Sequence, residues 1–339
     1  MHPIVRTFRT NIVEGRFFSL LASVFVIAVR WILYHFGNLP KPNLIADNYL
    51  YNEISHLFIQ PHISLIFSTL SIFIIAYILS YMNNRFGITR TRSNLPYVIP
   101  LFLFSLHPYF LMMNGSYIAI IFILIAFFPL LESYQKSDPY LYSFRSAILI
   151  AVASLFQIQA LFLVPLWWRG EFSMRGPQFR SFISSLFGVV LIYTSTFAIY
   201  YFNDNIGGFL IPFNSFYFIT FFKIPDFTTL KWIISTLVFS YFITIMILSV
   251  KAYSREKVLS LAFMQFLQFL IIFMLLLQII YWSKTIFFFN LSVALVSFLS
   301  AYFYTKTSSK GNILFAYITL LLFSMFYLSH LFTQILFSF

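Results

Sequence analysis

The sequence predicts an all-α integral membrane protein, a polytopic bundle of about nine full transmembrane helices plus one short re-entrant helical hairpin. Of the 339 residues, 60% are hydrophobic and only 9% are charged, whereas about a quarter are charged in a soluble domain. Apolar runs of about 20 residues, long enough to cross a hydrocarbon core of roughly 30 Å, recur along the whole chain. These runs are continuously apolar, which predicts helices and not the alternating strands of a β-barrel.

The first apolar run follows Arg6, Arg9 and Arg16, as the apolar region of a signal peptide would. It lacks a small-x-small cleavage site, so we expect a retained membrane anchor. Polar stretches are too short for a separate soluble domain, so residues 1–339 are interpreted as one membrane domain. The predicted full spans are 17–36, 61–82, 95–113, 116–134, 181–202, 231–250, 259–281, 285–304 and 313–337.

Segment 145–167 is long enough to cross, but it carries Ser154, Gln157 and Gln159 at its middle, where polar groups are costly in lipid. The distribution of lysine and arginine decides between two interpretations. If the segment enters and returns as two half-helices, 16 basic residues lie on one side and 4 on the other, with Arg30 inside a span. A full crossing gives 11 against 9. Because basic residues collect in cytoplasmic loops, we predict the hairpin.

This orientation predicts a cytoplasmic N-terminus, a periplasmic C-terminus and two sizeable outer loops, 37–60 and 203–230. The second loop contains IPFNSFYFITFFKIPDF, which is too aromatic for a free loop and too interrupted for a span. Aromatic rings favour the headgroup region, so we expect 203–230 to lie along the outer leaflet. A bundle of spans, 231–337, follows it.

The outer loop 37–60 carries the acids Asp47 and Glu53. An ordinary solvated loop is one interpretation. The functional interpretation is a carboxylate near the lipid headgroups that acts as a general base or holds a divalent cation, with Asp47 as the first candidate. Glu53 is the second candidate, but acids six positions apart share a helix face poorly, so a carboxylate dyad is not expected.

Arg30 lies near the outer end of the first predicted span. Its side chain could snorkel to the interface. Alternatively, it could bind a lipid phosphate, because a guanidinium group matches phosphate oxygens in a bidentate manner. Asp47 would then lie on the same side of the membrane, as a site for a lipid-phosphate-linked donor requires.

Other function classes receive little support. The net charge of +12 comes from short clusters between apolar runs, which indicates membrane orientation and not nucleic-acid binding. The chain has no cysteine, and it lacks the Walker, GxGxxG, HExxH and GxSxG motifs. A transporter remains a third hypothesis because of the hairpin, although the predicted spans carry no acids and no internal repeat is evident.

Four features in order resemble GT-C glycosyltransferases, polytopic enzymes that use polyprenyl-phosphate sugars. They are an opening span, an outer loop with an acid (ADNYLYNE, Asp47), a span pair (SLHPYFLMMNGSYIAIIFILIAFF) and a broken segment (SAILIAVASLFQIQALFLVPLWW) that ends in a basic loop. The resemblance covers residues 17–200 and implies a hairpin at the broken segment. The stretch VPLWWRGEFSMRGPQFRSFISSLFGVVLIY is also similar to an uncharacterised multi-spanning inner-membrane family of Bacteroidetes.

The resemblance implies a protein of the bacterial inner membrane that transfers a lipid-linked sugar at the outer face. In this hypothesis Arg30 holds the donor phosphate and Asp47 activates the acceptor or holds a divalent cation. The chain lacks the C-terminal soluble domain that many GT-C enzymes carry, so catalytic activity itself is left open. The alternative is a non-catalytic membrane subunit or assembly factor of a cell-envelope complex that binds other membrane proteins.

Overall fold

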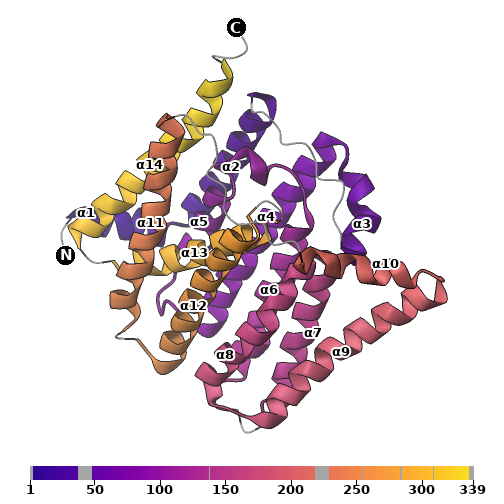
Figure 1. Ribbon diagram of the computed structural model, residues 1–339. Coiled ribbons are helices and arrows are strands. Elements are labelled where there is room, and N and C mark those ends of the chain that lie inside the picture. Colours follow the sequence, from indigo (N-terminus) through magenta and orange to yellow (C-terminus); the bar gives the residue numbers. More distant parts are fainter. Residues whose placement is uncertain are drawn as a thin grey trace.

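The computed structural model describes residues 3–36, 48–136, 138–217, 229–254, 256–282, 285–307 and 309–335, and these residues form an all-helical bundle (Figure 1). Its helices are α1 (Pro3–Phe8), α2 (Arg16–Phe36), α3 (Tyr49–Ser55), α4 (Pro61–Phe86), α5 (Leu95–Leu103), α6 (Gly115–Glu132), α7 (Tyr140–Phe156), α8 (Leu163–Arg175), α9 (Phe179–Phe202), α10 (Ile206–Leu210), α11 (Thr229–Tyr253), α12 (Val258–Ile280), α13 (Phe287–Lys306) and α14 (Lys310–Ile335). Within these ranges, eight helices are long and apolar enough to cross a membrane, namely α2, α4, α6, α9, α11, α12, α13 and α14. The prediction of an all-α membrane bundle is confirmed.

Local sequence signals set several helix boundaries. Helix α4 begins with Pro61 at its first turn, where the missing N–H removes no helical hydrogen bond. It ends at Phe86 and is terminated by Gly87, whose φ of 60° is a left-handed conformation that glycine adopts without steric cost. Helix α6 is capped by Asn114, whose side-chain oxygen accepts a 3.0 Å hydrogen bond from the backbone N–H of Ser116. These signals place both ends of α4 and the start of α6.

The prediction of a continuous span over 95–113 is wrong. Helix α5 ends at Leu103, and the chain then continues to residue 114 with only a short 3-10 turn at Pro108–Phe110. Proline disfavours the helical conformation in the residue before it, and His107 is accordingly extended, with φ −134° and ψ 140°. The third predicted span, 95–113, is therefore a short helix followed by a segment without α-helix.

The hairpin prediction for 145–167 is confirmed, and the hairpin is longer than expected. Helix α7 ends where Gln157 becomes extended (φ −151°, ψ 98°), a short 3-10 helix follows, and α8 returns. Arg175 near the end of α8 donates to the Pro139 carbonyl at 3.3 Å and to the Ser143 hydroxyl, both at the start of α7. The two helices are therefore antiparallel and begin and end at the same end of the bundle. With 17 residues, α7 is about 25 Å long.

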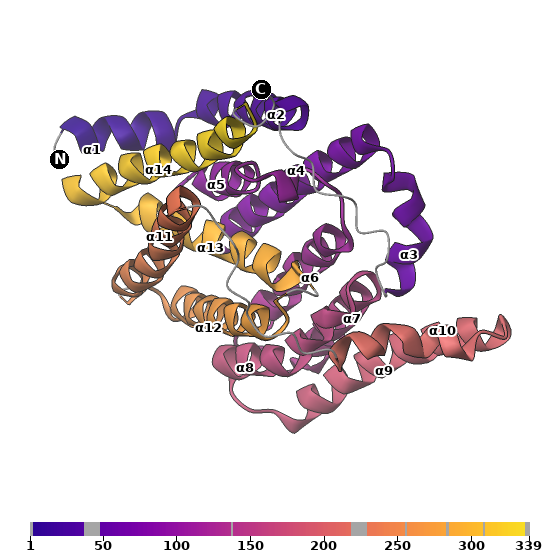
Figure 2. The same ribbon diagram turned by 45° about the horizontal axis from the view of Figure 1, so that its top comes forward.

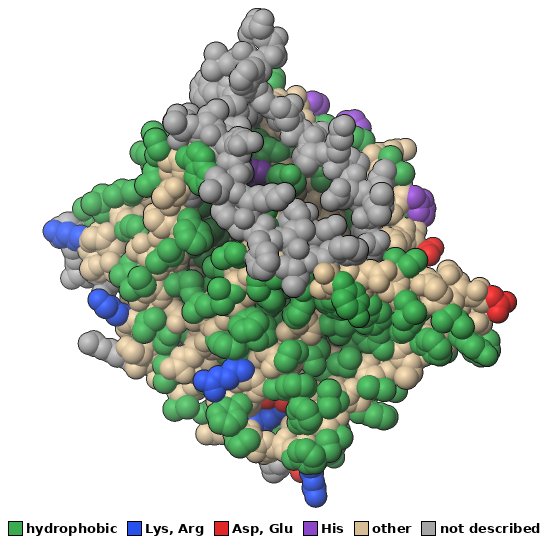
Figure 3. Space-filling view, in the orientation of Figure 1, with side chains coloured by type: hydrophobic (Ala, Val, Ile, Leu, Met, Phe, Trp, Pro, Cys, Tyr) green, Lys and Arg blue, Asp and Glu red, His purple; other side chains and the backbone are tan. Residues whose placement is uncertain are grey.

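Loops that are far apart in the sequence meet at the end of the bundle where the hairpin begins. Arg85 at the end of α4 pairs with Glu132 at the end of α6 at 2.5 Å. Glu256, between α11 and α12, pairs with Arg90 at 3.0 Å and with Lys306 at 2.6 Å. We name this the basic end; it comprises α1 and the loops after α4, α6, α8, α11 and α13. In Figure 3 lysine and arginine lie at the left and at the bottom, where some adjoin acidic side chains, whereas histidine lies at the upper right and other acidic side chains lie at the right.

Cysteine labelling will test the hairpin directly, because the chain has no native cysteine. Asp138 precedes α7 and Gln178 follows α8, and both are exposed. We expect Asp138→Cys and Gln178→Cys to react with a membrane-impermeant maleimide only after the cells are permeabilised, since basic loops face the cytoplasm. Asp204→Cys, in the exposed turn after α9, should react in intact cells. Labelling of positions 138 and 178 from opposite sides would contradict the hairpin.

Helix α13 forms the centre of the bundle. In its candidate span, 94% of the residues are buried within the protein, whereas only 17–22% are buried in the spans of α2, α9, α11 and α14. It packs against α5, α11 and α12, which surround it in Figure 2. Helix α13 is thus buried on all sides as a core helix, and the exposed apolar faces of the outer helices suit contact with lipid.

Candidate functional site

The structure describes two of the three site residues predicted from the sequence, Arg30 and Glu53. Asp47 lies outside the described residues. Glu53 lies on α3 with its side chain exposed. Arg30 lies on α2 and is only 1% exposed. The guanidinium group is therefore inside the protein and not at an interface with lipid headgroups.

The Arg30 guanidinium is bound by protein oxygens. Its Nε donates to Thr69 Oγ1 at 2.9 Å, and its Nη1 donates to the Phe104 carbonyl at 3.0 Å. Its Nη2 donates to Ser68 Oγ at 2.7 Å and to the Phe110 carbonyl at 2.9 Å. Four of the five N–H donors of an arginine are thus used. Binding of a lipid phosphate by Arg30 stays a prediction, and this geometry favours a structural role.

That structural role is to satisfy the non-helical segment 104–114. Unpaired backbone carbonyls inside a membrane cost several kcal/mol each, so irregular chain there must be buried and hydrogen-bonded within the protein. Besides the two carbonyls held by Arg30, this segment has further side-chain partners. Three hydroxyl groups donate to its carbonyls, namely Ser68 to Leu111 at 2.6 Å, Tyr117 to Phe110 at 2.9 Å and Tyr51 to Met113 at 3.0 Å. The backbone N–H of Met113 donates to Ser64 Oγ at 2.7 Å.

A group of polar side chains gathers where the hairpin turns. The backbone N–H of Ile158 donates to Asn48 Oδ1 at 3.0 Å. Gln157 Nε2 donates to Gln159 Oε1 and, at 3.3 Å, to Thr285 Oγ1. We name Asn48, Gln157, Gln159 and Thr285, together with Gln278, which donates to the Thr285 carbonyl at 2.9 Å, the tip cluster. Gln157 is half-buried and the other four are buried, so amides from several elements converge at one place.

An aromatic group borders the tip cluster. Tyr49, which follows Asn48, donates from its hydroxyl to the Phe209 carbonyl of α10 at 2.7 Å. The rings of Tyr193, Tyr200 and Phe213 surround Tyr49 within 6.4 Å of its centroid. Burial, with Tyr193 and Tyr200 nearby, raises the pKa of Tyr49, so its hydroxyl stays a donor at neutral pH. We name the end of the bundle formed by α3, the hairpin turn and α10 the tip end.

The chemistry of the tip cluster is that of a hydrogen-bonding site. Its amide and hydroxyl groups can bind hydroxyls or phosphate oxygens, but none of them is a general base at neutral pH. In the described parts of the chain, no group of three histidine, aspartate or glutamate side chains could hold a metal ion. A proton-accepting or cation-binding role would therefore fall to an acid such as Asp47, the residue before Asn48 in the sequence.

Comparisons with protein-family models, with curated proteins and with solved structures found no match for this chain. The resemblance to GT-C glycosyltransferases and to the Bacteroidetes family therefore stays an expectation from sequence. The membrane bundle, the hairpin and the tip cluster rest on the structure itself.

Sequence reasoning did not single out Glu171 and Arg175, which form a buried ion pair on α8. Arg175 Nη2 lies 2.9 Å from Glu171 Oε2, and the side chains are 3% and 7% exposed, respectively. Burial raises the pKa of the Glu171 carboxyl, and Arg175 and the Ser143 hydroxyl counteract part of the rise. The signal in the sequence was an acid four positions before an arginine on a predicted helix, which is a common pattern on solvated helices.

Proposed function

We propose that this integral membrane protein transfers a sugar from a polyprenyl-phosphate donor to an acceptor at its tip end. The observation that carries the proposal is the hydrogen bond between Ile158 N and Asn48 Oδ1. It fixes the residue next to Asp47 against a buried group of amides at the hairpin turn. The proposal assigns the activation of a sugar hydroxyl to Asp47, the residue before Asn48 in the sequence.

The orientation follows from the charge distribution. The basic end faces the cytoplasm by the positive-inside rule, so the tip end faces the periplasm of a bacterial inner membrane. Helices α2 and α14 are parallel, since Phe8, which precedes α2, contacts Tyr317 and the Tyr327 hydroxyl donates to the Val29 carbonyl. Helix α14 follows Lys306 of the basic end, so both helices start there. In this proposal the N-terminus is cytoplasmic and the C-terminus is periplasmic.

Each group has one role in the proposed reaction. Asp47 accepts the proton of the acceptor hydroxyl, or holds a divalent cation that neutralises the donor phosphate. Gln157 and Thr285 hold hydroxyls of the sugar through hydrogen bonds. The aromatic side chains around Tyr49 form an apolar wall at the level of the headgroups. Arg30 contributes indirectly, because its hydrogen bonds hold segment 104–114 in place.

The test uses the wild-type protein in proteoliposomes. They are supplied with polyprenyl-phosphate hexoses and pentoses that carry a radiolabelled sugar, together with a membrane extract as the source of acceptor. We expect at least one donor to release polyprenyl phosphate and to transfer label at a rate that depends on the protein. Empty liposomes are the control. If no donor in the panel reacts, sugar transfer is refuted for these donors and the second candidate function gains support.

The second candidate is a non-catalytic subunit or assembly factor of a membrane complex. Its specific support is the use of the Arg30 donors within the protein, together with the filled centre around α13. Such a protein should copurify with stoichiometric membrane partners and show no donor turnover. The exposed apolar faces of the outer helices would then contact protein as well as lipid.

A further inference from the structure

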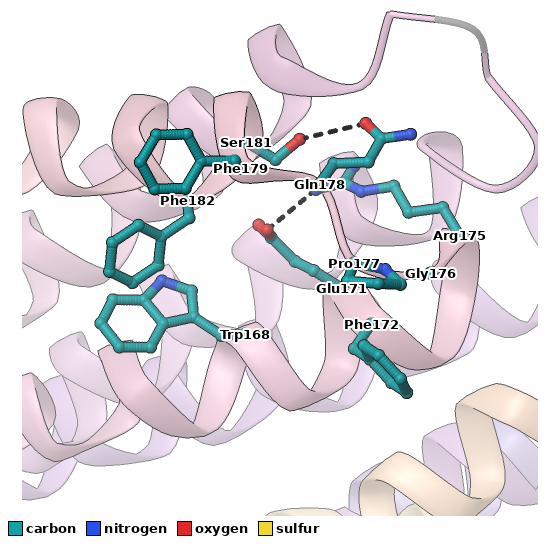
Figure 4. Close-up of a pocket in the computed structure, with 10 residues that line it drawn as sticks. All are labelled: Trp168, Glu171, Phe172, Arg175, Gly176, Pro177, Gln178, Phe179, Ser181 and Phe182. Carbon is teal, nitrogen blue, oxygen red and sulfur yellow. Dashed lines mark hydrogen bonds and ion pairs between the residues drawn. The ribbon is translucent and has the colours of Figure 1, made fainter.

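A hollow of about 500 Å³ opens at the basic end, between the end of α8 and the start of α9. In Figure 4 the rings of Trp168, Phe179 and Phe182 lie along one side, and the carboxylate of Glu171 extends between them and Arg175. The hollow lies at the opposite end of the hairpin from the tip cluster and takes no part in the proposed sugar transfer.

The buried ion pair beside the hollow has unused hydrogen-bonding capacity. Over the described residues, Glu171 Oε1 and Arg175 Nε have no hydrogen-bond partner, although both atoms are buried. Glu171 as a whole is only 6% exposed. A buried carboxylate oxygen without a donor is unfavourable by as much as a lost hydrogen bond. A ligand that offers a hydrogen-bond donor, best a charged one, would satisfy Glu171 Oε1.

The start of α9 favours an anion, whereas Glu171 favours a hydrogen-bond donor or a cation. This helix has 24 residues and no acid in its first turn. Within the described structure, no side chain caps it, although its N-cap residue, Gln178, lies at the rim of the hollow. The N–H groups at the start of a long helix and its dipole favour an anion. Arg180, exposed in the same turn, adds positive charge.

An apolar path leaves the hollow along α9. Phe179, Ile183 and Phe187 are spaced four residues apart, so they share one helix face. They are 76%, 50% and 59% exposed. Helix α9 is a candidate membrane span, so this face suits acyl chains. The ligand therefore has three parts, namely an anion, a hydrogen-bonding cation and a hydrocarbon tail.

We infer that this hollow binds the headgroup of phosphatidylethanolamine from the leaflet at the basic end. Its phosphate lies at the start of α9, its ammonium donates to Glu171 Oε1, and its acyl chains follow Phe179, Ile183 and Phe187. A phosphocholine headgroup carries no N–H donor and leaves Glu171 Oε1 unsatisfied. A phosphatidylglycerol headgroup offers hydroxyl donors but no cation to pair with the carboxylate.

Native mass spectrometry of the purified full chain tests this inference. Phosphatidylethanolamine, phosphatidylcholine and phosphatidylglycerol with identical acyl chains are titrated separately. We expect phosphatidylethanolamine to bind at least about tenfold more tightly than the other two, because a charged hydrogen bond is lost with each of them. Equal affinity for the three lipids would overturn the inference. Soluble glycerophosphoethanolamine should compete weakly, and competition equal to that of the lipid would assign the site to a free phosphoamine.

Variants assign the preference to this hollow. Glu171→Gln should lower the affinity for phosphatidylethanolamine to that for phosphatidylcholine. The matched control Glu132→Gln changes an acid at the same end of the bundle and should leave the affinity unchanged. If Glu171→Gln proves unstable, Gln178→Trp decides, because it places a ring in the hollow from an exposed position and leaves the ion pair intact. Undiminished binding in Gln178→Trp would refute the site.

Discussion

Replacement of Arg30 with methionine is expected to lower the free energy of unfolding by about 2–4 kcal/mol, although it removes a buried positive charge. Methionine keeps much of the side-chain volume but donates no hydrogen bond. The Phe104 carbonyl then loses its guanidinium partner in the interior, and the Phe110 carbonyl keeps the Tyr117 hydroxyl. The non-helical segment should loosen. Thermal unfolding in detergent should show a midpoint lower by about 3–6 °C.

Two further variants separate this structural role from phosphate binding. Arg180→Met removes an exposed arginine and should change stability by less than about 0.5 kcal/mol. Arg30→Lys should be nearly as destabilising as Arg30→Met, because an ammonium group lacks the planar fork that reaches two carbonyls and two hydroxyls together. A stable Arg30→Lys protein with weakened donor binding would instead support the lipid-phosphate role.

Asp47→Asn is expected to reduce sugar transfer by about 10²–10⁴-fold while protein abundance and thermal stability stay unchanged. Asparagine preserves size and hydrogen bonding but neither accepts the proton nor carries the charge that holds a cation. The measurement is the release of polyprenyl phosphate by proteoliposomes that contain equal amounts of wild-type and variant protein.

The controls for Asp47→Asn are two other acids. Asp204→Asn changes an exposed acid in the turn after α9 and should retain wild-type activity. Glu53→Gln changes the second candidate acid, which is exposed on α3, and should have a small effect if Asp47 alone is the base. An active protein in which Asp47→Asn transfers sugar at the wild-type rate would eliminate the proposed mechanism, whatever the donor.

The parts of the fold that follow from composition were predictable. Eight of the nine predicted spans match the eight long apolar helices, because hydrophobicity over about 20 residues is a property of the local sequence. The hairpin was also predictable. A full crossing would have distributed the basic residues almost evenly, and Arg175 now contacts Pro139 at the start of α7, as a returning helix requires.

The one predicted span that is not a long helix, 95–113, shows the limit of reasoning from local sequence. Segment 95–113 is apolar enough to be taken for a helix, and the break before Pro108 carries a weak signal. Its non-helical chain persists because Arg30, which lies 74 and 80 positions from its carbonyl partners, satisfies them. No window of the sequence contains both Arg30 and these carbonyls, so the role of this arginine was not predictable.

The sequence by itself determined that this protein is a membrane bundle with its basic loops at one end. Both properties depend on hydrophobicity and charge, which can be read from each segment of the sequence without knowledge of its neighbours in space. The tertiary structure alone decided which polar groups meet, namely Arg30 with the broken segment, Asn48 with the hairpin turn, and the Glu171–Arg175 pair with the hollow at the start of α9. In a membrane interior a polar group is stable only with a partner, and the packing of distant helices selects that partner.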